Sequence, residues 1–276
     1  MQPELFRIHA ELEDRHWWFV GRRRIMQAVV RKLVAPNSGA TVVDIGCGTG
    51  ANIASLAGEY QCVGVDTSPE AIALARQRYP TVKYLLGPAP AVLGDVAGTA
   101  DVFLSMDVLE HIEDDFRAFA EQLSAAKPGA FFVITVPADA ALWSGHDEAF
   151  GHYRRYDRKR LALLWSGLPV KEIGISYFGA RLYPVVRAVR TVSRLRGAPF
   201  GKGGTDLLMP SRAANSMLTQ LFAGERTRVL SAMNGRANPY ARGSSLLAVV
   251  QRLEGAVPPR AKPVGIDRAF DGVAPR

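Results

Sequence analysis

Short runs of apolar residues alternate with amphipathic segments along most of the chain. The run from Thr41 to Ile45 is apolar and β-branched apart from one aspartate, which is typical of a buried parallel strand. Strands are predicted at residues 41–45, 61–66, 82–86, 101–105, 130–136, 170–178 and 245–252. Helical spacing predicts helices between them. The pattern therefore indicates an α/β fold whose mostly parallel sheet carries helices on both faces.

Helical patterns also frame this alternating core. Residues 4–35 are predicted to be helical in two pieces, the second at 22–33. Further helices are expected at 51–57, 69–78, 109–123, 160–166, 182–196 and 211–230. Residues 1–254 are predicted to form one domain, with a helical cap at 1–38 and a helical insert at 179–243 before the last strand. The tail at 255–276 is rich in Pro and Gly, so it is predicted to be disordered.

The formal charge is divided unevenly between the two halves. Residues 1–150 hold 12 Lys+Arg and 19 Asp+Glu, a net charge of −7, whereas residues 151–276 hold 22 and 7, a net charge of +15. The helix at 182–196 combines one apolar side with arginines and no acid. It could form a lid over a lipophilic or phosphorylated acceptor, rest on an anionic membrane surface, form a dimer contact, or pack on the body with its arginines in solvent.

Several kinds of protein are not indicated. Cys47 and Cys62 lack the spacing of a disulfide framework or of a metal site, so no metal is predicted. No apolar run approaches the ~18–20 residues of a membrane span, and the acidic start lacks the apolar region of a signal peptide. We expect a cytoplasmic protein, with peripheral membrane contact through 181–196 as an open alternative.

A glycine-rich turn follows the first strand and indicates a nucleotide-type ligand. Gly46, Gly48 and Gly50 let the backbone turn sharply and approach a ligand closely. Asp44, inside the strand, is a carboxylate that needs a partner when buried. Asp66 ends the second strand, where a carboxylate can accept hydrogen bonds from both hydroxyls of a ribose. An NAD site shares these features.

Four segments, in their order and spacing, resemble the class I S-adenosylmethionine-dependent methyltransferases: VVDIGCGTG (42–50), GVDTSPEAIALAR (64–76), DVFLSMDVLEHIED (101–114) and KPGAFFVITVP (127–137). In addition, HWWFVGRRR (16–24) and LWSGHDEAFGHYRRY (142–156) resemble elements of a small-molecule-directed branch of that family. The fold that this resemblance implies is Rossmann-like, a seven-stranded sheet whose last strand, 245–252, runs antiparallel.

The resemblance implies S-adenosyl-L-methionine as the cofactor and a set of residues that hold it. These are Asp44, Gly46, Cys47, Gly48, Gly50, Asp66, Thr67, Met106, Trp17 and Arg22. Asp66 would hold the ribose hydroxyls, Thr67 would border the adenine, and Met106 would lie near the methionine portion. Residues 87–90 hold no acid to receive the adenine amino group, so adenine recognition would rest on backbone or apolar contacts.

Methyl transfer from a sulfonium is an in-line displacement, in which the protein mainly aligns nucleophile, carbon and sulfur. A general base assists when the acceptor is a hydroxyl or a protonated amine. The candidate bases are His111, His146 and His152. The candidate acceptor contacts lie in a polar and aromatic loop after the fifth strand, which could equally be a solvated surface loop. They are Trp143, Tyr153, Arg155 and Tyr156.

The acceptor is predicted to be a small or lipid-linked, anionic molecule that is methylated on oxygen or carbon. The fourth strand ends in SMDV (105–108) rather than in the Asn/Asp-Pro-Pro-Tyr motif of methyltransferases acting on base or amide nitrogens, so nucleic acid is a less favoured partner. One alternative is an NAD-dependent dehydrogenase, although neither Tyr153 nor Tyr156 begins a Tyr-x-x-x-Lys pattern. Another is a binding module for a membrane surface or nucleic acid. The oligomeric state is left open.

Overall fold

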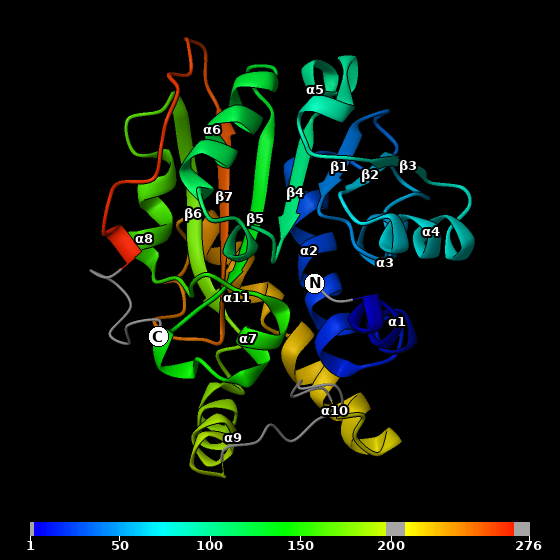
Figure 1. Cartoon of the computed structure of the whole chain (residues 1–276), viewed down its shortest axis with the longest axis vertical. Helices are drawn as coiled ribbons and strands as arrows, with labels where there is room; N and C mark the ends of the chain where they lie inside the picture. The colour runs from blue at the N-terminus through cyan, green and yellow to red at the C-terminus, as the bar shows by residue number, and fades with distance from the viewer. Residues whose placement is uncertain (1–2, 197–207, 268–276) are drawn as a thin grey trace.

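The computed structural model describes residues 3–196 and 208–267, and its centre is one seven-stranded sheet (Figure 1). The strand order is β3-β2-β1-β4-β5-β7-β6. The strands are β1 (Thr41–Ile45), β2 (Gln61–Asp66), β3 (Lys83–Leu86), β4 (Val102–Met106), β5 (Phe131–Pro137), β6 (Val170–Phe178) and β7 (Ser245–Arg252). Strand β7 pairs antiparallel with β5 and β6, and the other pairs are parallel. The predicted fold class is confirmed.

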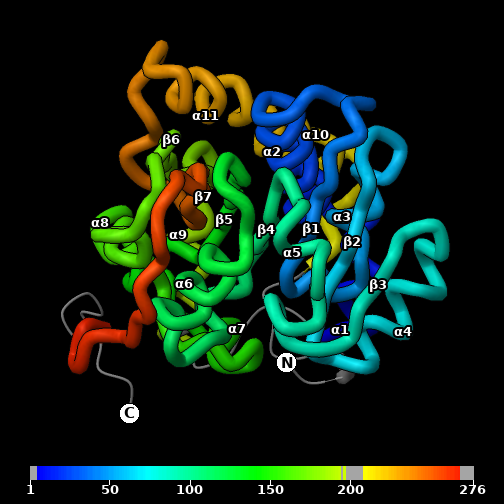
Figure 2. Tube along the Cα trace, turned by 90° about the horizontal axis from the view of Figure 1, so that it is seen from above, coloured from blue at the N-terminus to red at the C-terminus, as the bar shows by residue number. Residues whose placement is uncertain are grey.

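Helices cover both faces of the sheet, and Figure 2 shows α2, α10 and α11 on one side with α5 and α6 on the other. The first face carries α2 (Trp17–Leu33), α3 (Ala51–Ala54), α4 (Pro69–Arg78), α10 (Arg212–Ala223) and α11 (Arg226–Met233). The second face carries α5 (Asp95–Thr99), α6 (Asp115–Ala125) and α8 (Arg158–Ala162). Three further helices lie near the lower end of the sheet in Figure 1: α1 (Pro3–Leu12), α7 (Gly145–Phe150) and α9 (Tyr183–Arg196).

The alternation of side chains along β1 decides where its aspartate points. Val43 and Ile45 belong to the core beneath α5 and α6, whereas Val42 belongs to the core beneath α2. Because successive side chains of a strand point to opposite faces, Asp44 shares the face of Val42. The carboxylate of Asp44 is therefore directed toward α2, whose basic stretch contains Arg22.

Several helices differ from the sequence prediction in their bounds. Helix α2 begins at Trp17 rather than at Arg22, because the His16 imidazole caps it by accepting a hydrogen bond from the Trp18 amide. The predicted helix at 109–123 is a 3-10 turn, η2 (Leu109–His111), followed by α6.

The predicted helix at 211–230 is two helices, α10 and α11, with a break before Arg226. The carboxylate of Glu225 lies at this break and is fully buried. It accepts hydrogen bonds from the amides of Ala180 and Arg181 at 3.1 and 2.8 Å. These bonds hold the start of α11 against the residues that directly follow β6.

Two segments predicted to be irregular have structure of their own. The stretch after β3 contains η1 (Ala91–Leu93) and α5, and the loop after β5 contains η3 (Ala140–Leu142) and α7. Another 3-10 turn, η4 (Leu163–Trp165), follows α8.

The prediction of a disordered tail is wrong for residues 255–267. The Lys262 amide donates to Asp114 at 2.9 Å, and Asp267 forms ion pairs with Arg154 and Arg160 at 3.1 Å. These contacts hold the segment against the body next to α8. Residues 268–276, and the stretch at 197–207 between the predicted helices of the insert, lie outside the described residues.

Within the two described ranges, no helix combines the length and the apolar character that crossing a bilayer requires.

Candidate active site

The candidate site lies at the carboxyl ends of β1, β2 and β4. The chain passes from β1 outward to β2 and β3, and then returns to place β4 on the other side of β1. Ligands of open α/β sheets bind in the crevice at such a change of direction. The glycine turn lies there because it directly follows β1.

The turn after β1 needs glycine at three positions. Gly46, Gly48 and Gly50 have φ values of 70°, 54° and 91°, which favour glycine. A Cβ on Gly46 would lie 2.6 Å from the Val108 side chain, so the turn packs closely against the segment after β4. A Cβ on Gly48 would have no atom within 4 Å. The backbone at Gly48 is therefore open to a ligand.

Asp66 at the end of β2 fixes this turn. One carboxylate oxygen accepts a hydrogen bond from the Gly48 amide at 2.8 Å, and the other accepts from the Ser68 amide at 2.9 Å. The carboxylate is half-buried, and the neighbouring Thr67 is exposed. The turn is thus held by Asp66 rather than by a long helix, since α3 has only 4 residues instead of the predicted seven. The Cys47 side chain packs in the core, and its amide donates to Val65.

Buried polar atoms without hydrogen-bond partners gather beside the turn. In the described part of the chain these include both carboxylate oxygens of Asp44, both of Glu110, and the Nε of Arg22. Burial raises the pKa of Asp44 to about 7, although Arg22 opposes the shift. Burial likewise raises the pKa of Glu110 to about 8. Such unsatisfied groups are costly unless a ligand completes them.

Arg22 reaches this region from α2. Its guanidinium pairs with Asp107, the first residue after β4, and stacks 4.4 Å from the centre of the Trp18 ring. Burial lowers the pKa of Arg22 to about 10, against the charges of Asp44 and Glu110. Trp17, by contrast, packs edge-on against Phe222 of α10 at 5.6 Å, which is a packing contact of the insert. The predicted role of Trp17 at the cofactor stays a prediction, because this contact concerns the insert and not the glycine turn.

The chain after α1 also touches the glycine turn. The Thr49 hydroxyl donates to the Glu13 carboxylate at 2.7 Å, and Arg78 of α4 pairs with the same carboxylate. His9 of α1 lies 5.3 Å, ring to ring, from Phe150 of α7. The N-terminal segment therefore bridges the turn after β1 and the loop after β5.

The three candidate histidines lie near one another but differ in their surroundings. The rings of His111 and His152 are 4.7 Å apart and nearly perpendicular. His146 stacks on Phe150 at 4.5 Å and lies 6.5 Å from His152. Burial lowers the pKa of His111 to about 3, and it also lowers the pKa values of His146 and His152. All three rings are therefore neutral near pH 7.

His152 belongs to a charged network centred on Asp147. Its Nδ1 lies 2.9 Å from one oxygen of the Asp147 carboxylate. Arg155 donates to both oxygens, and Arg190 of α9 donates to the second at 2.9 Å. Burial alone would raise the pKa of Asp147, but Arg155, the His152 hydrogen bond and Arg190 hold it well below the usual range. This network fixes the loop that carries two candidate histidines.

The four predicted acceptor contacts differ in burial and in their hydrogen-bond partners. Tyr156 is only 1% exposed and its hydroxyl donates to Asp115 of α6 at 2.8 Å, so its prediction as an acceptor contact is wrong and it is a core residue. Arg155 is also buried, and its guanidinium is taken up by Asp147 and the Ala138 carbonyl. Tyr153 is half exposed, and Trp143 donates weakly to Glu148 at 3.4 Å. These last two remain predictions.

Four residues that the sequence did not single out take part in this region. Asp107 pairs with Arg22, and Glu110 lies buried beside His111. Glu13 bonds to the turn, and Leu86 is 47% exposed and stands in register with Asp66 across β2 and β3. Only Leu86 had a usable signal, as an apolar residue ending the third strand where adenine recognition lacked an acid.

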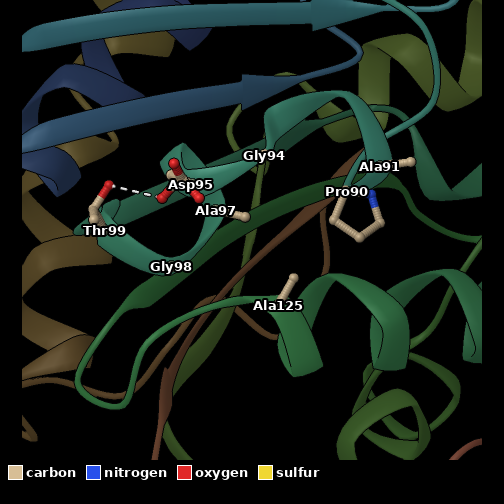
Figure 3. A pocket seen from close by; sticks show the side chains of 8 residues that line it. All are labelled: Pro90, Ala91, Gly94, Asp95, Ala97, Gly98, Thr99 and Ala125. Atoms are coloured by element: carbon tan, nitrogen blue, oxygen red, sulfur yellow. Dashed lines mark hydrogen bonds between the residues drawn. The ribbon is translucent and has the colours of Figure 1, made fainter.

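A further pocket lies away from the glycine turn (Figure 3). It is lined mainly by small side chains of η1, α5 and the end of α6, with Asp95 as its charged group. Helix α5 precedes β4, so this pocket lies at the opposite end of the sheet and cannot share a ligand with the turn.

Comparison with known proteins identifies the family. Residues 18–181 match the family described as the methyltransferase domain. The chain belongs to this family. A "probable S-adenosylmethionine-dependent methyltransferase" of Mycolicibacterium smegmatis is 29% identical over 140 residues, covering 49% of this chain and 51% of that protein. The norajmaline N-methyltransferase of Rauvolfia serpentina is 35% identical over 101 residues, 34% of each chain. This chain thus spans about half of the first relative and about a third of the second.

Solved structures agree on the fold. The YcgJ protein of Bacillus subtilis superposes with a TM-score of 0.52 at 17% identity, over 85% of this chain and all of that one. The [4+2]-cyclase SpnF gives a TM-score of 0.52 at 16% identity, over 84% and 82%. At such identities the likeness concerns the fold alone, and the fold does not determine the chemistry. The dehydrogenase alternative is not favoured by any of these matches.

The residues present fit the cofactor of this family, S-adenosylmethionine. The ligand carries a sulfonium and an ammonium group, and Asp44 offers a buried carboxylate without a hydrogen-bond partner in the described ranges. The open backbone at Gly48 and the carboxylate of Asp66 lie at the same edge of the sheet. The exposed Leu86 supplies an apolar surface next to Asp66.

Proposed function

We propose that this protein transfers the methyl group of S-adenosylmethionine to an oxygen or carbon atom of a small or lipid-linked acceptor that carries negative charge. Binding of the methyl donor is supported by the buried Asp44 carboxylate, which lacks a hydrogen-bond partner among the described residues and lies beneath the glycine turn. A cationic ligand would compensate this charge.

The chain's own residues mainly bind and orient. Asp44 and the backbone at Gly48 would hold the methionine portion, and Asp66 would hold the ribose hydroxyls. When bound, the cofactor supplies an electrophilic methyl group on sulfur. Arg22 and Asp107 form a fixed ion pair beside β4, which keeps this wall of the site in place. The neutral histidines after β4 and β5 can accept a proton from a hydroxyl acceptor.

Helix α9 supports the acceptor class. It exposes an apolar stripe formed by Val185, Val189, Val192 and Leu195, which are 60%, 39%, 41% and 83% exposed. Its arginines include the exposed Arg187, which also lines a shallow groove with Tyr183 and Val192. An apolar face bordered by cations fits a lipid chain with an anionic head group. The anionic head group is therefore the feature that we assign to the acceptor or to the surface that presents it.

The same helix is joined to the loop after β5. The Tyr183 hydroxyl donates to Asp139, and Arg190 donates to the Leu142 carbonyl and to Asp147. An acceptor held on α9 would therefore lie beside the loop that carries His152. This continuity supports a role of the insert in acceptor binding.

Relatives support small-molecule acceptors in a general way. The norajmaline N-methyltransferase and the trans-aconitate 2-methyltransferase of Deinococcus radiodurans act, by their names, on small molecules. Because the first is an N-methyltransferase, the preference for oxygen or carbon rests on the sequence at the end of β4 alone.

The test is transfer of a radiolabelled methyl group from S-adenosylmethionine to an aqueous metabolite extract and to a lipid extract. Label in the acidic lipid or acidic metabolite fraction supports the proposal, and label only in nucleic acid or in neutral compounds contradicts it. Sedimentation with vesicles of anionic lipid then tests whether the apolar stripe of α9 binds a lipid surface. Val189→Ser with Val192→Ser should release the protein, whereas Leu253→Ser, an exposed leucine after β7, should not.

A further inference from the structure

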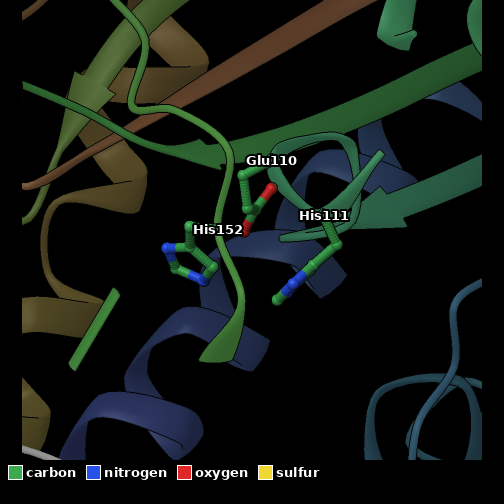
Figure 4. A group of neighbouring side chains, drawn as sticks. All are labelled: Glu110, His111 and His152. Atoms are coloured by element: carbon green, nitrogen blue, oxygen red, sulfur yellow. The ribbon is translucent and has the colours of Figure 1, made fainter. Parts of the chain in front are cut away.

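Glu110, His111 and His152 bring three potential metal ligands together. Glu110 and His111 belong to η2, and His152 follows α7. One ligand atom from each residue lies within 4.8 Å of the others. Figure 4 shows the carboxylate and the two imidazole rings converging on a common space. Donors to a single zinc ion lie roughly 3–4 Å apart, so a closure of the side chains by about 1 Å would complete the set.

We propose that these three residues bind a divalent transition-metal ion, and that its open position takes an oxygen atom of the acceptor. The role of the ion rests on the proposed methyl transfer, whereas the binding of the ion does not. Two imidazoles and one carboxylate suit zinc, manganese or iron(II) better than magnesium or calcium. Three protein ligands leave a position for substrate, as in catalytic metal sites.

The state of Glu110 is the first argument. Its side chain is 0% exposed, and neither carboxylate oxygen has a hydrogen-bond partner within residues 3–196 and 208–267. Arg22 acts on it through charge, but the Arg22 guanidinium forms its ion pair with Asp107. A buried carboxylate normally has a partner or coordinates a metal. The two histidines are the other donors that face it.

The hydrogen bond of His152 is the second argument. Its Nδ1 lies 2.9 Å from the Asp147 carboxylate, which Arg155 and Arg190 also contact. A carboxylate with two arginine partners acts as an acceptor, so Nδ1 carries the proton and Nε2 keeps its lone pair. Carboxylate–histidine–metal arrangements of this kind orient the ring and increase its basicity as a ligand. Asp147 is thus a positioning residue for the proposed site.

The location of the site gives the ion a role. The η2 turn follows β4, and Val108 at its start contacts the glycine turn at Gly46. An acceptor hydroxyl bound to the ion would have a lowered pKa. The hydroxyl proton would leave to water, and the acceptor oxygen would then form a bond to the methyl carbon of S-adenosylmethionine. The carbon–sulfur bond would break as that bond forms, turning the sulfonium into a thioether.

The competing explanation is that Glu110 is protonated and that the His111 and His152 rings merely pack edge to face. The experiment uses the full chain after treatment with a chelator, titrated with Co²⁺ as a spectroscopic probe and with Zn²⁺ in a calorimeter. We expect one equivalent of Co²⁺ with visible absorption typical of imidazole and carboxylate ligands. Glu110→Gln and His152→Gln should each weaken binding at least tenfold.

His146→Gln is the matched control, because this histidine lies in the same loop but outside the three-donor group. Its Co²⁺ affinity should equal that of the wild type. Binding of S-adenosylhomocysteine, measured in parallel, separates the two proposals. Cofactor binding without metal binding would overturn the metal site and leave the proposed function standing. Unchanged Co²⁺ binding in both Glu110→Gln and His152→Gln would also overturn it.

Discussion

Arg190 of α9 donates a hydrogen bond of 2.9 Å to the buried carboxylate of Asp147. The basic helix of the insert is thereby tied to the loop that follows β5. Arg190 also donates to the Leu142 carbonyl, and Tyr183 of the same helix donates to Asp139. The insert and the loop therefore form one unit, on the side of the site where we propose that the acceptor binds.

Replacing Arg190 by alanine should loosen this unit. We expect a loss of about 1–3 kcal/mol in the free energy of unfolding, because a buried carboxylate loses a charged donor. Hydrogen–deuterium exchange should rise in α9, while the affinity for S-adenosylhomocysteine stays unchanged. Arg212→Ala, an exposed arginine at the start of α10, serves as the control and should change neither. Equal exchange in α9 for wild type and Arg190→Ala would contradict the anchoring role.

Replacing Asp66 by alanine should weaken cofactor binding. The carboxylate holds the Gly48 amide and is expected to hold the ribose hydroxyls. Calorimetry with S-adenosylhomocysteine should show a loss of at least tenfold, about 1.4 kcal/mol or more. Glu70→Ala removes a nearby exposed acid and should bind normally. An unaltered affinity for Asp66→Ala would mean that the ribose lies elsewhere.

Asp44 should give the cofactor-free protein a distinctive pH dependence. Burial raises its pKa from 3.8 to about 7, so between these values the folded state binds more protons than the unfolded state. Stability from this group is therefore present at low pH and is lost as pH rises toward 7. The unfolding temperature of the wild type should fall relative to that of Asp44→Asn over this interval.

The exposed acid Asp95 provides the control for this pH effect. Asp95→Asn should follow the wild type at every pH, because Asp95 lies at the other end of the sheet. If wild type and Asp44→Asn changed in parallel from about pH 4 to pH 7, Asp44 would already be ionised in the folded state.

Tyr156→Phe distinguishes a core residue from an acceptor contact. The buried hydroxyl donates to Asp115, which keeps Arg160 as a second partner. Loss of this hydrogen bond should cost about 1–3 kcal/mol in urea unfolding. Once an acceptor is known, its KM should be unchanged at temperatures where the variant is folded. A raised KM without destabilisation would restore the original assignment.

The sheet could be predicted from the sequence because its strands are short apolar runs with distinct ends. The bounds of β1, β2 and β7 agree with the predicted ranges. The place of the glycine turn after β1 and of Asp66 at the end of β2 could also be predicted, because glycine spacing and strand ends are visible in the local sequence.

The remaining parts of the site depend on partners that are distant in the sequence. Tyr156 looks like a surface aromatic until Asp115 and Arg160 surround it. Trp17 looks like part of a pocket, but its ring packs on Phe222, which is 205 residues later in the sequence. Burial of a carboxylate such as Glu110 has no local signature, because only the packing of the whole chain removes it from water.

The segment that contains His9 and Glu13 has a kinetic consequence. It contacts Phe150 in the acceptor loop and Thr49 in the glycine turn. Because one segment contacts both regions, we expect exchange of the donor product to displace it and to disturb the loop after β5 as well. We therefore expect a compulsory order of substrate addition and product release, and product-inhibition patterns of a random mechanism would contradict it. The segment that contains His9 and Glu13 would then determine the order in which substrates bind and products leave.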